Sequence, residues 1–320
     1  MQQKLPTGSK MISVKHLSGV GDERARMRVQ RVVRNILLSN ALFVAALRLA
    51  SAVHAAPVEE IVRVPVSVHT SSGPLVQTIV VTVFRDDQRG KSPYLIINHG
   101  RSGDPDKRAT FGRARFPEIS RQFVALGFTV LVPTRIGYGV SQGPDVESPG
   151  PSCDNRNYAP GFDTAAEEIG AVLRSGEAIV HADTSRGLVV GTSFGGMLSI
   201  KLATNGLPGL AGVVNFAGGM GGNPTQWPEH PCAAAQIDQL YRGYGARARV
   251  PSLWLYSSND RYWGPLLPRQ WYADFVHAGG TAEFVQLPPF AEDGHMSFNG
   301  NPDAWSPAFQ QFVRKLGLID

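Results

Sequence analysis

The feature that most constrains the fold of this chain is a serine between two glycines at the end of an apolar run. Residues 188–190 are apolar, and a Gly-Thr-Ser-Phe-Gly pentapeptide (residues 191–195) leads from them into a helix-forming segment. This is G-x-S-x-G where a strand turns sharply into a helix, the setting of a nucleophile elbow. So tight a turn requires small neighbours, which Gly191 and Gly195 provide, while Gly196 gives the helix room against the sheet.

The same turn makes Ser193 the candidate nucleophile. Ser193 lies at the start of the predicted helix, where free N–H groups and the positive end of the helix dipole stabilise a developing oxyanion. The alternative is a Gly/Ser-rich connection between a strand and a helix that has no catalytic role. The apolar strand before the pentapeptide and the helix former after it favour the catalytic interpretation.

The remaining apolar segments predict an α/β fold with a mostly parallel central sheet. Residues 61–68 and 77–84 alternate around a Ser-Gly-Pro turn, which is typical of an antiparallel hairpin. Later apolar runs are continuous and separated by helical segments, as in a parallel sheet with helices on both faces. We expect one domain over residues 56–320, with a short insert around 217–249. The further strands are expected at 94–98, 128–133, 187–190, 210–216, 251–257 and 282–287, and helices at 116–126, 163–181, 233–244, 268–278 and 308–316.

A serine nucleophile needs a base, and the base needs a carboxylate that holds its tautomer. In an open parallel sheet these groups come from loops at the carboxyl ends of strands. Asp260 and His295 each follow a predicted strand, and the chain order Ser, Asp, His is the one that G-x-S-x-G folds use. We therefore predict Asp260 and His295 as the partners of Ser193. Asp163 is expected to cap a helix, and Asp293 is too close to His295 in sequence to orient its ring easily.

An oxyanion hole requires two fixed N–H donors. The first is expected to be the backbone N–H of Phe194, directly after the nucleophile. The second should come from the loop after the strand at 94–98, where Gly100 permits a bend and the N–H of Arg101 is the candidate donor. His99 could act as a base, but a histidine at a strand end before glycine is more commonly a structural hydrogen-bonding group.

Three further residues are candidates for contact with the substrate. Arg135 lies in a glycine-punctuated loop after the strand at 128–133. It either ties loops together or meets a substrate carboxylate, and the structural role is favoured. Tyr262 and Trp263 are aromatic side chains that follow the predicted acid Asp260 closely in the chain.

The charge distribution argues against a nucleic-acid-binding protein. The chain carries 31 Lys/Arg and 26 Asp/Glu, a net charge of +5. Nine of the basic and two of the acidic residues lie within residues 1–55, so the remainder holds 22 basic against 24 acidic residues. Because the basic character belongs to the first segment and not to the predicted domain, we expect no nucleic-acid partner.

Residues 1–55 are expected to be an export leader that is removed. Arginines between 28 and 34 precede an apolar stretch over 36–47, and small residues before Ala55 suit a cleavage site, with Met27 as the natural start. The alternatives are an N-terminal amphipathic helix or a membrane anchor, but the apolar stretch is interrupted and too short to span comfortably. We expect an exported protein, periplasmic or secreted, without a stable membrane anchor.

The two cysteines suit an oxidising compartment. An even count in an exported chain favours one disulfide, between Cys153 and Cys232, with two unpaired thiols as the alternative. Neither cysteine has a histidine or a second cysteine at metal-binding spacing, so we expect no metal. We also expect no cofactor, because a P-loop is missing and the glycine run at 218–222 lacks the context of a dinucleotide site.

Over residues 60–318 the chain resembles the α/β-hydrolase superfamily, particularly its dienelactone hydrolase-like group. The matching motifs are His99-Gly100, the Arg135-x-Gly-Tyr-Gly-x-Ser loop, Gly-x-Ser193-x-Gly, Asp260 and Gly294-His295. True dienelactone hydrolases use a cysteine nucleophile, so the serine here implies a carboxylesterase-type hydrolase of a small ester or lactone. The alternatives are a prolyl-oligopeptidase-like exopeptidase on the same fold and a non-catalytic binding protein that keeps the hydrolase fold.

Overall fold

The two alternating segments near residue 60 form the long antiparallel hairpin that they predict. In the computed structural model, which describes residues 31, 57–176 and 178–320, β1 (Val58–Thr70) pairs with β2 (Gly73–Arg85) along its whole length. The expected leader, its start at Met27 and its cleavage after Ala55 lie outside the described residues, apart from residue 31. The account below concerns the unit Ala55–Asp320.

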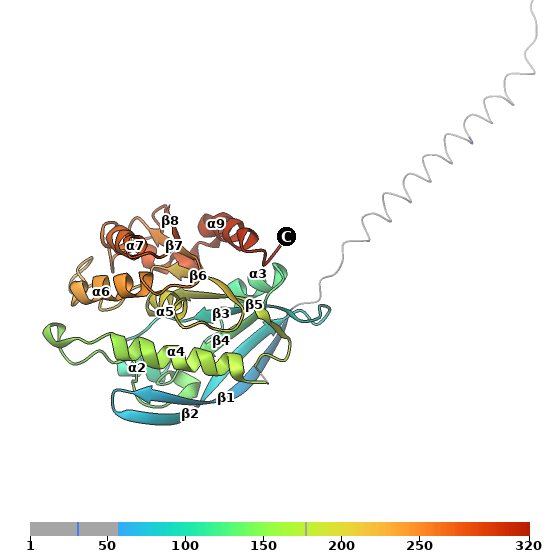
Figure 1. Ribbon diagram of the computed structural model, residues 1–320, viewed down its shortest axis with the longest axis horizontal. Coiled ribbons are helices and arrows are strands. Elements are labelled where there is room, and N and C mark those ends of the chain that lie inside the picture. The colour runs from blue at the N-terminus through green and yellow to red at the C-terminus, as the bar shows by residue number, and fades with distance from the viewer. Residues whose placement is uncertain (1–30, 32–56, 177) are drawn as a thin grey trace, which may run out of the picture. The chain divides into compact units, whose positions relative to one another are not determined.

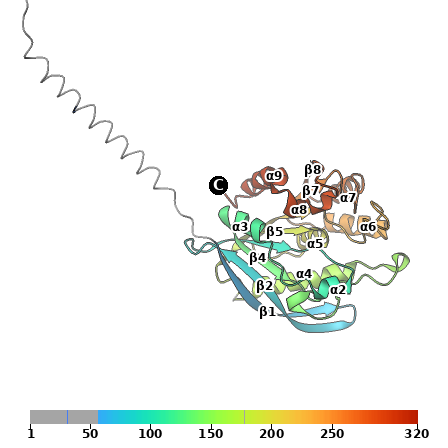
Figure 2. The same cartoon turned by 180° about the vertical axis from the view of Figure 1, so that it is seen from behind.

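The hairpin is joined to a parallel sheet, and together they form eight strands in the order β1-β2-β4-β3-β5-β6-β7-β8 (Figures 1 and 2). β2 pairs antiparallel with β4, and all later neighbours run parallel. This is the mostly parallel sheet with an antiparallel start that the sequence predicts. The parallel strands are β3 (Ser92–Asn98), β4 (Thr129–Thr134), β5 (Ala182–Thr192), β6 (Leu210–Phe216), β7 (Ser252–Ser257) and β8 (Ala282–Leu287).

Helices cover both faces of the sheet, so successive side chains of a central strand enter different cores. In β3, Ile96 belongs to one core, whereas Leu95 and Ile97 belong to the other. This is why the central strands have continuous apolar sequences. The first core contains residues of α4 (Ala159–Arg174), α5 (Phe194–Leu202), α6 (Ala234–Gly245) and α7 (Leu267–His277), and the second contains residues of α3 (Pro117–Ala125) and α9 (Pro302–Lys315).

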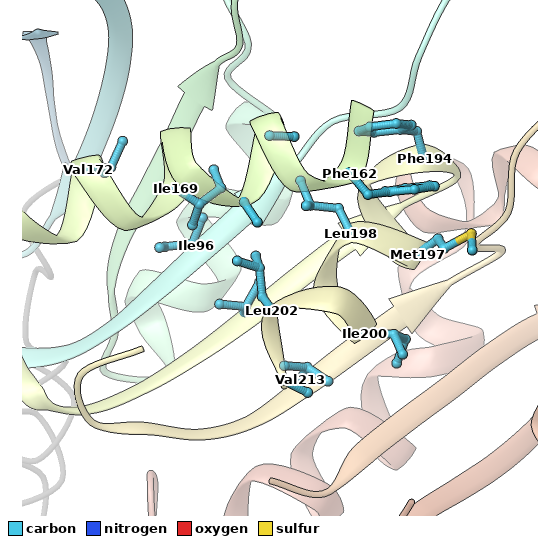
Figure 3. Packing of buried hydrophobic residues seen from close by; sticks show 14 of the residues in the cluster. Ile96, Phe162, Ile169, Val172, Phe194, Met197, Leu198, Ile200, Leu202 and Val213 are labelled. Carbon is cyan, nitrogen blue, oxygen red and sulfur yellow. The ribbon is translucent and has the colours of Figure 1, made fainter. Parts of the chain in front are cut away.

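The helix that follows the predicted elbow is held on all sides. All residues of α5 except Lys201 are buried. Figure 3 shows its apolar side chains packed between α4 and the sheet. At its first residue, the ring of Phe194 stacks on Phe162 of α4 with 4.5 Å between ring centroids. The start of α5 is therefore fixed by packing as well as by its own hydrogen bonds.

Short helices lie in the loops at the carboxyl edge of the sheet. Two of them follow β3 and β8, and they are α2 (Pro105–Ala109) and α8 (Ser297–Gly300). Three single turns of 3-10 helix also occur there, at Gly139–Ser141, Cys153–Asn155 and Gly294–Met296. None of the helices in the described part of the chain has the length and apolar character needed to cross a bilayer.

Two helix predictions were wrong at their ends. The helix expected over 163–181 is α4, which begins at Ala159 and ends at Arg174, because the chain turns at Ser175 to enter β5 at Ala182. Asp163 therefore does not cap this helix, and its carboxylate instead pairs with Lys201 Nζ at 2.7 Å. The last helix was expected from 308, but α9 begins at Pro302 and continues through Pro307.

Candidate active site

Ser193 lies at the junction between β5 and α5 in a conformation that few side chains adopt. Its φ of 57° and ψ of −123° are unfavourable for a residue with a Cβ atom. A Cβ atom at Gly191 would collide with the carbonyl of Gly195, and one at Gly195 with the carbonyl of Asn98. At Gly196 it would lie 2.5 Å from Asn215 Oδ1 of β6. The three glycines are thus required by close backbone approach around the turn.

On one side of Ser193, the loops after β7 and β8 bring Asp260 and His295 together. His295 Nδ1 and Asp260 Oδ2 are 3.0 Å apart, and both side chains are buried. Asp260 Oδ1 accepts the backbone N–H groups of Tyr262 at 2.8 Å and Trp263 at 3.3 Å. Since the carboxylate accepts from Nδ1–H, the imidazole keeps Nε2 as its free acceptor nitrogen.

The rings that follow Asp260 fix the orientation of the imidazole. Tyr262 stacks on His295 with 3.9 Å between centroids, and Trp263 meets it edge-on at 5.7 Å. The indole N–H of Trp263 donates to the carbonyl of Ala217 at 2.7 Å. The rival acid Asp293 is used differently, because its Oδ1 accepts the backbone N–H groups of His295 and Arg261, each at 3.0 Å.

On the other side of Ser193, the loop after β3 passes close to the serine. A Cβ atom at Gly100 would lie 3.3 Å from Ser193 Cβ and 3.8 Å from its Oγ. Arg101 lines the same cavities as Ser193. The N–H of Phe194 is the first of α5, where no intrahelical acceptor is available. The two expected N–H donors, those of Phe194 and Arg101, therefore belong to segments that meet at Ser193.

His99 is a buried neutral histidine that takes part in the loop's own hydrogen bonds. Its Nε2 accepts the backbone N–H of Arg135 at 3.2 Å, so Nδ1 carries the proton and donates to the carbonyl of Gly100 at 2.7 Å. Burial lowers the pKa of His99 well below its usual value, and the charge of Arg135 lowers it further. These contacts fit the structural role expected for His99.

Arg135 is fully buried and lines neither cavity at Ser193. Its guanidinium donates to the carbonyls of His99 at 2.8 Å and Gly100 at 3.2 Å, and to Glu147 Oε1 at 2.5 Å. These donors point into the protein, away from both cavities, and the geometry argues against the alternative that Arg135 meets a substrate carboxylate. Of the two roles considered for Arg135, the structure favours the one that ties loops together.

Sequence reasoning missed the acids that accompany these arginines. Glu147 binds Arg135 and also accepts the hydroxyl of Tyr138 at 2.9 Å. Asp145 Oδ2 pairs with Arg101 Nη2 at 2.7 Å and with Arg108 at 3.2 Å. Both acids lie in a loop between β4 and α4 that has no hydrophobic period, so no pattern in the sequence marked them.

Two cavities of different character meet at Ser193. The smaller has a volume of about 490 Å³, contains His295, and is lined by the rings of Phe111, Phe116 and Phe298. The larger, about 910 Å³, is lined by polar groups of the loops at 101–107, 145–156 and 219–227. Tyr262 borders both cavities, whereas Trp263 borders only the larger. Ser193 and His295 share the smaller cavity but make no hydrogen bond to each other in the described part of the chain.

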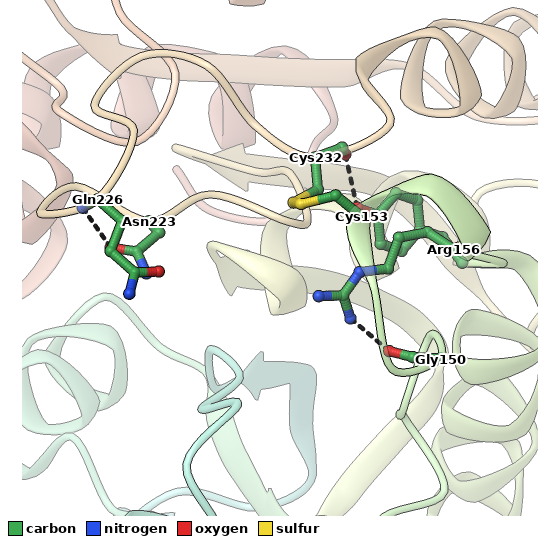
Figure 4. Close-up of a disulfide and its surroundings, with 7 residues drawn as sticks. Gly150, Cys153, Arg156, Asn223, Gln226 and Cys232 are labelled. Atoms are coloured by element: carbon green, nitrogen blue, oxygen red, sulfur yellow. Dashed lines mark hydrogen bonds between the residues drawn. A yellow bond between two sulfur atoms is a disulfide. The ribbon is translucent and has the colours of Figure 1, made fainter.

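A disulfide links two walls of the larger cavity. Cys153 and Cys232 are bonded, with Cα atoms 5.0 Å apart, as expected from the sequence (Figure 4). The bond joins the loop after β4 to the segment between β6 and α6, which is the first part of the insert expected around 217–249. The side chain of Arg156 lies beside it and donates to the carbonyl of Gly150 at 2.7 Å. The described residues contain no group of three His, Cys, Asp or Glu side chains that could hold a metal ion.

Comparison with known proteins gives a family and a set of similar folds. The sequence model of the alpha/beta hydrolase family matches residues 94–316. No curated protein matches the chain significantly in sequence.

Solved structures share the fold at low identity. An esterase of Pyrococcus furiosus is 12% identical with a TM-score of 0.52, covering 80% of this chain and 90% of its own. A dienelactone hydrolase-like promiscuous phosphotriesterase from metagenomic libraries is 17% identical with a TM-score of 0.52, covering 82% of this chain and 98% of its own. An acylaminoacyl peptidase of Pyrococcus horikoshii is 11% identical with a TM-score of 0.54, covering 82% of this chain and 42% of its own. Identities this low show a common fold and no more.

Proposed function

The chain belongs to the alpha/beta hydrolase family, and from this premise we propose that it is a serine hydrolase that cleaves a small carboxylic ester. The observation that carries the proposal is the 3.0 Å contact of His295 Nδ1 with Asp260, beside a cavity that Ser193 also lines. The strained backbone of Ser193 supports it, because such strain persists mainly at functional sites.

In the proposed mechanism, Ser193 Oγ attacks the ester carbonyl carbon while His295 Nε2 takes its proton. The carbonyl oxygen becomes an oxyanion, which the N–H groups of Phe194 and Arg101 stabilise. Asp260 holds the proton on Nδ1 and stabilises the imidazolium that forms. The imidazolium then protonates the departing alkoxide, and the acyl group remains on Ser193. A water molecule, deprotonated by His295, attacks the acyl carbon, the bond to Ser193 Oγ breaks as His295 returns the proton to Oγ, and the acid is released.

The two cavities suggest a substrate with two unlike halves. An ester bound at Ser193 directs its acyl and alcohol parts into different spaces. The smaller cavity favours a compact apolar or aromatic group, since phenylalanine rings surround it. The larger cavity favours a bulkier group with hydrogen-bonding atoms, since polar loops surround it. Tyr262 and Trp263 lie where they can contact that group.

A substrate comparison tests the reaction type. The purified protein is offered short-chain p-nitrophenyl esters and, in parallel, dipeptide p-nitroanilides. We expect turnover of the esters and labelling of Ser193 by a fluorophosphonate, which reacts with activated serines. Faster turnover of the anilides would favour the exopeptidase alternative, which shares a fold with the acylaminoacyl peptidase. No labelling and no turnover would favour the non-catalytic binding protein.

We also propose that the protein is exported and that residues 1–55 are removed. The disulfide between Cys153 and Cys232 supports an oxidising compartment. N-terminal sequencing of protein recovered from the cell envelope or the medium should find a mature chain that begins near Ala56. Recovery of an uncleaved chain from the cytosol would contradict the proposal.

A further inference from the structure

We propose that Arg135 is a positioning residue that sets both N–H donors of the oxyanion hole. The inference rests on the proposed chemistry of Ser193 and adds to it a residue that touches no substrate. Arg135 follows β4 directly, and β4 is the parallel neighbour of β3, which carries the donor loop. Its guanidinium can therefore reach across from one strand end to the next.

The first contact fixes the peptide that contains the N–H of Arg101. In a planar trans peptide, the carbonyl of Gly100 and the N–H of Arg101 point in opposite directions. Arg135 Nη2 holds that carbonyl at 3.2 Å, and His99 Nδ1 holds it from a second direction at 2.7 Å. With the carbonyl held on the side of Arg135, the N–H of Arg101 must point to the opposite side.

The second contact is with the residue that supplies the other donor. The Arg135 guanidinium carbon lies 4.9 Å from the centroid of the Phe194 ring. The other partner of that ring is Phe162, stacked at 4.5 Å. A guanidinium over an aromatic face is attracted by the ring quadrupole. One buried cation thus contacts the peptide of the first donor and the side chain of the second.

The arrangement requires arginine and not simply a positive charge. Nη1 and Nη2 reach two successive carbonyls, those of His99 and Gly100, while Nε reaches Glu147. A lysine ammonium is a point charge and cannot reproduce this planar fork. Glu147 neutralises the cation, and the carbonyls of His99 and Gly100 accept two of its other N–H groups, so that burial of the charge is tolerated.

The test is Arg135→Lys, which keeps the charge but loses the fork. We expect kcat for p-nitrophenyl acetate to fall about 10- to 100-fold with KM changed less than about threefold, since misplaced oxyanion donors act mainly on the transition state. A boronic acid, which forms a tetrahedral adduct with an active serine, should lose affinity by a similar factor. The number of folded active sites is measured by complete labelling of Ser193 with a fluorophosphonate, and kcat is expressed per labelled site.

A double variant guards against misfolding of the single one. Arg135→Met with Glu147→Gln leaves no unpaired buried charge, and we expect the same loss of kcat and boronate affinity. The matched control is Glu168→Gln, which alters a buried carboxyl bonded to the N–H of Ile136 but not to the donor loop. Its kcat should stay within about twofold of the wild type.

The possible results separate the two proposals. If both Arg135 variants keep the wild-type kcat and boronate affinity per labelled site, the positioning role is overturned and the proposed function is unaffected. A loss of activity that only follows the loss of labelled sites would also overturn it, because Arg135 would then be purely structural. Turnover that survives Ser193→Ala would overturn the proposed function, and the positioning role with it.

Discussion

The two sides of Ser193 hold their buried charges in different ways. On the base side, Asp260 is satisfied by groups from its own loop and from the next one, namely the N–H groups of Tyr262 and Trp263 and the ring of His295. On the oxyanion side, Arg135 depends on carbonyls after β3 and on Glu147. The guanidinium also lies against the ring of Phe194. The base side is thus built from the ends of two strands, and the oxyanion side from three segments: the loop after β3, the loop after β4 and the start of α5.

This difference has consequences for how each side responds to change. A side chain held by adjacent backbone N–H groups keeps its place when a distant loop moves. A guanidinium that links three segments transmits the movement of any one of them to the others. We therefore expect substitutions on the base side to alter chemistry with little loss of stability, and substitutions on the oxyanion side to alter both.

The largest effect is expected where the two sides meet. Ser193→Ala should lower kcat for p-nitrophenyl esters by about 10⁴- to 10⁶-fold, and His295→Ala by a similar factor, because residues that act as a unit do not contribute additively. Both variants should remain folded by circular dichroism. Steady-state kinetics on proteins free of contaminating esterase measures the loss, and a folded Ser193→Ala variant with wild-type turnover would refute the mechanism.

The base side alone is tested by Asp260→Asn. The amide oxygen can still accept the N–H groups of Tyr262 and Trp263, but the NH₂ group faces His295 and favours the wrong tautomer. We expect kcat to fall on the order of 10³- to 10⁴-fold with a small change in the melting temperature. If kcat stayed within tenfold of the wild type, the role of Asp260 in holding the tautomer would be excluded.

The same contrast explains what the sequence could predict. Ser193, Asp260 and His295 each follow a strand end, so strand prediction and chain order suffice to nominate them. The central strands could also be predicted, because burial on both faces of the sheet gives them continuous apolar sequences. Glu147 could not be predicted, because it lies in an irregular loop and its role appears only when β3 and β4 are side by side. The end of α4 at Arg174 was missed because the apolar residues Ala178, Ile179 and Val180 follow shortly after it, although Ser175 and Gly176 interrupt the helix.

The next largest effect is expected from removal of the disulfide in the wall of the larger cavity. Replacing Cys153 and Cys232 together by serine removes a cross-link over a sequence separation of 79 residues. Chain entropy sets an upper value of about 4–5 kcal/mol for the lost free energy of unfolding, and about 2–4 kcal/mol is typical. Urea unfolding measures it, with a wild-type sample alkylated after reduction as a second comparison. The KM for a bulky polar ester should rise more than that for p-nitrophenyl acetate, and unchanged stability would contradict the cross-link.

The smallest effect concerns two buried carboxyls, those of Asp260 on the base side and of Glu168 in α4, which does not contact the donor loop. Asp260 has both oxygens hydrogen-bonded, whereas Glu168 accepts one N–H, from Ile136 at 2.9 Å, and its Oε1 has no partner in the described part of the chain. Burial raises the pKa of Glu168 from 4.5 to about 8. The folded protein therefore binds this proton more tightly than the unfolded chain does. The contribution of this bound proton to the free energy of unfolding is complete below about pH 4.5 and is lost as the pH rises through about 8.

Glu168→Gln should remove this pH dependence, because the amide does not titrate. The free energy of unfolding of the wild type, measured relative to the variant, should fall by about 1–2 kcal/mol between pH 5 and pH 9. A shift of the pKa from 4.5 to about 8 would nominally give about 5 kcal/mol at 1.4 kcal/mol per unit, and we expect less because local relaxation stabilises a buried charge. Glu118→Gln, at an exposed carboxylate of α3, is the matched control and should show no such trend. A constant difference between the wild type and Glu168→Gln across this range would mean that Glu168 is ionised throughout, and the contrast with Asp260 would then rest on hydrogen bonding alone.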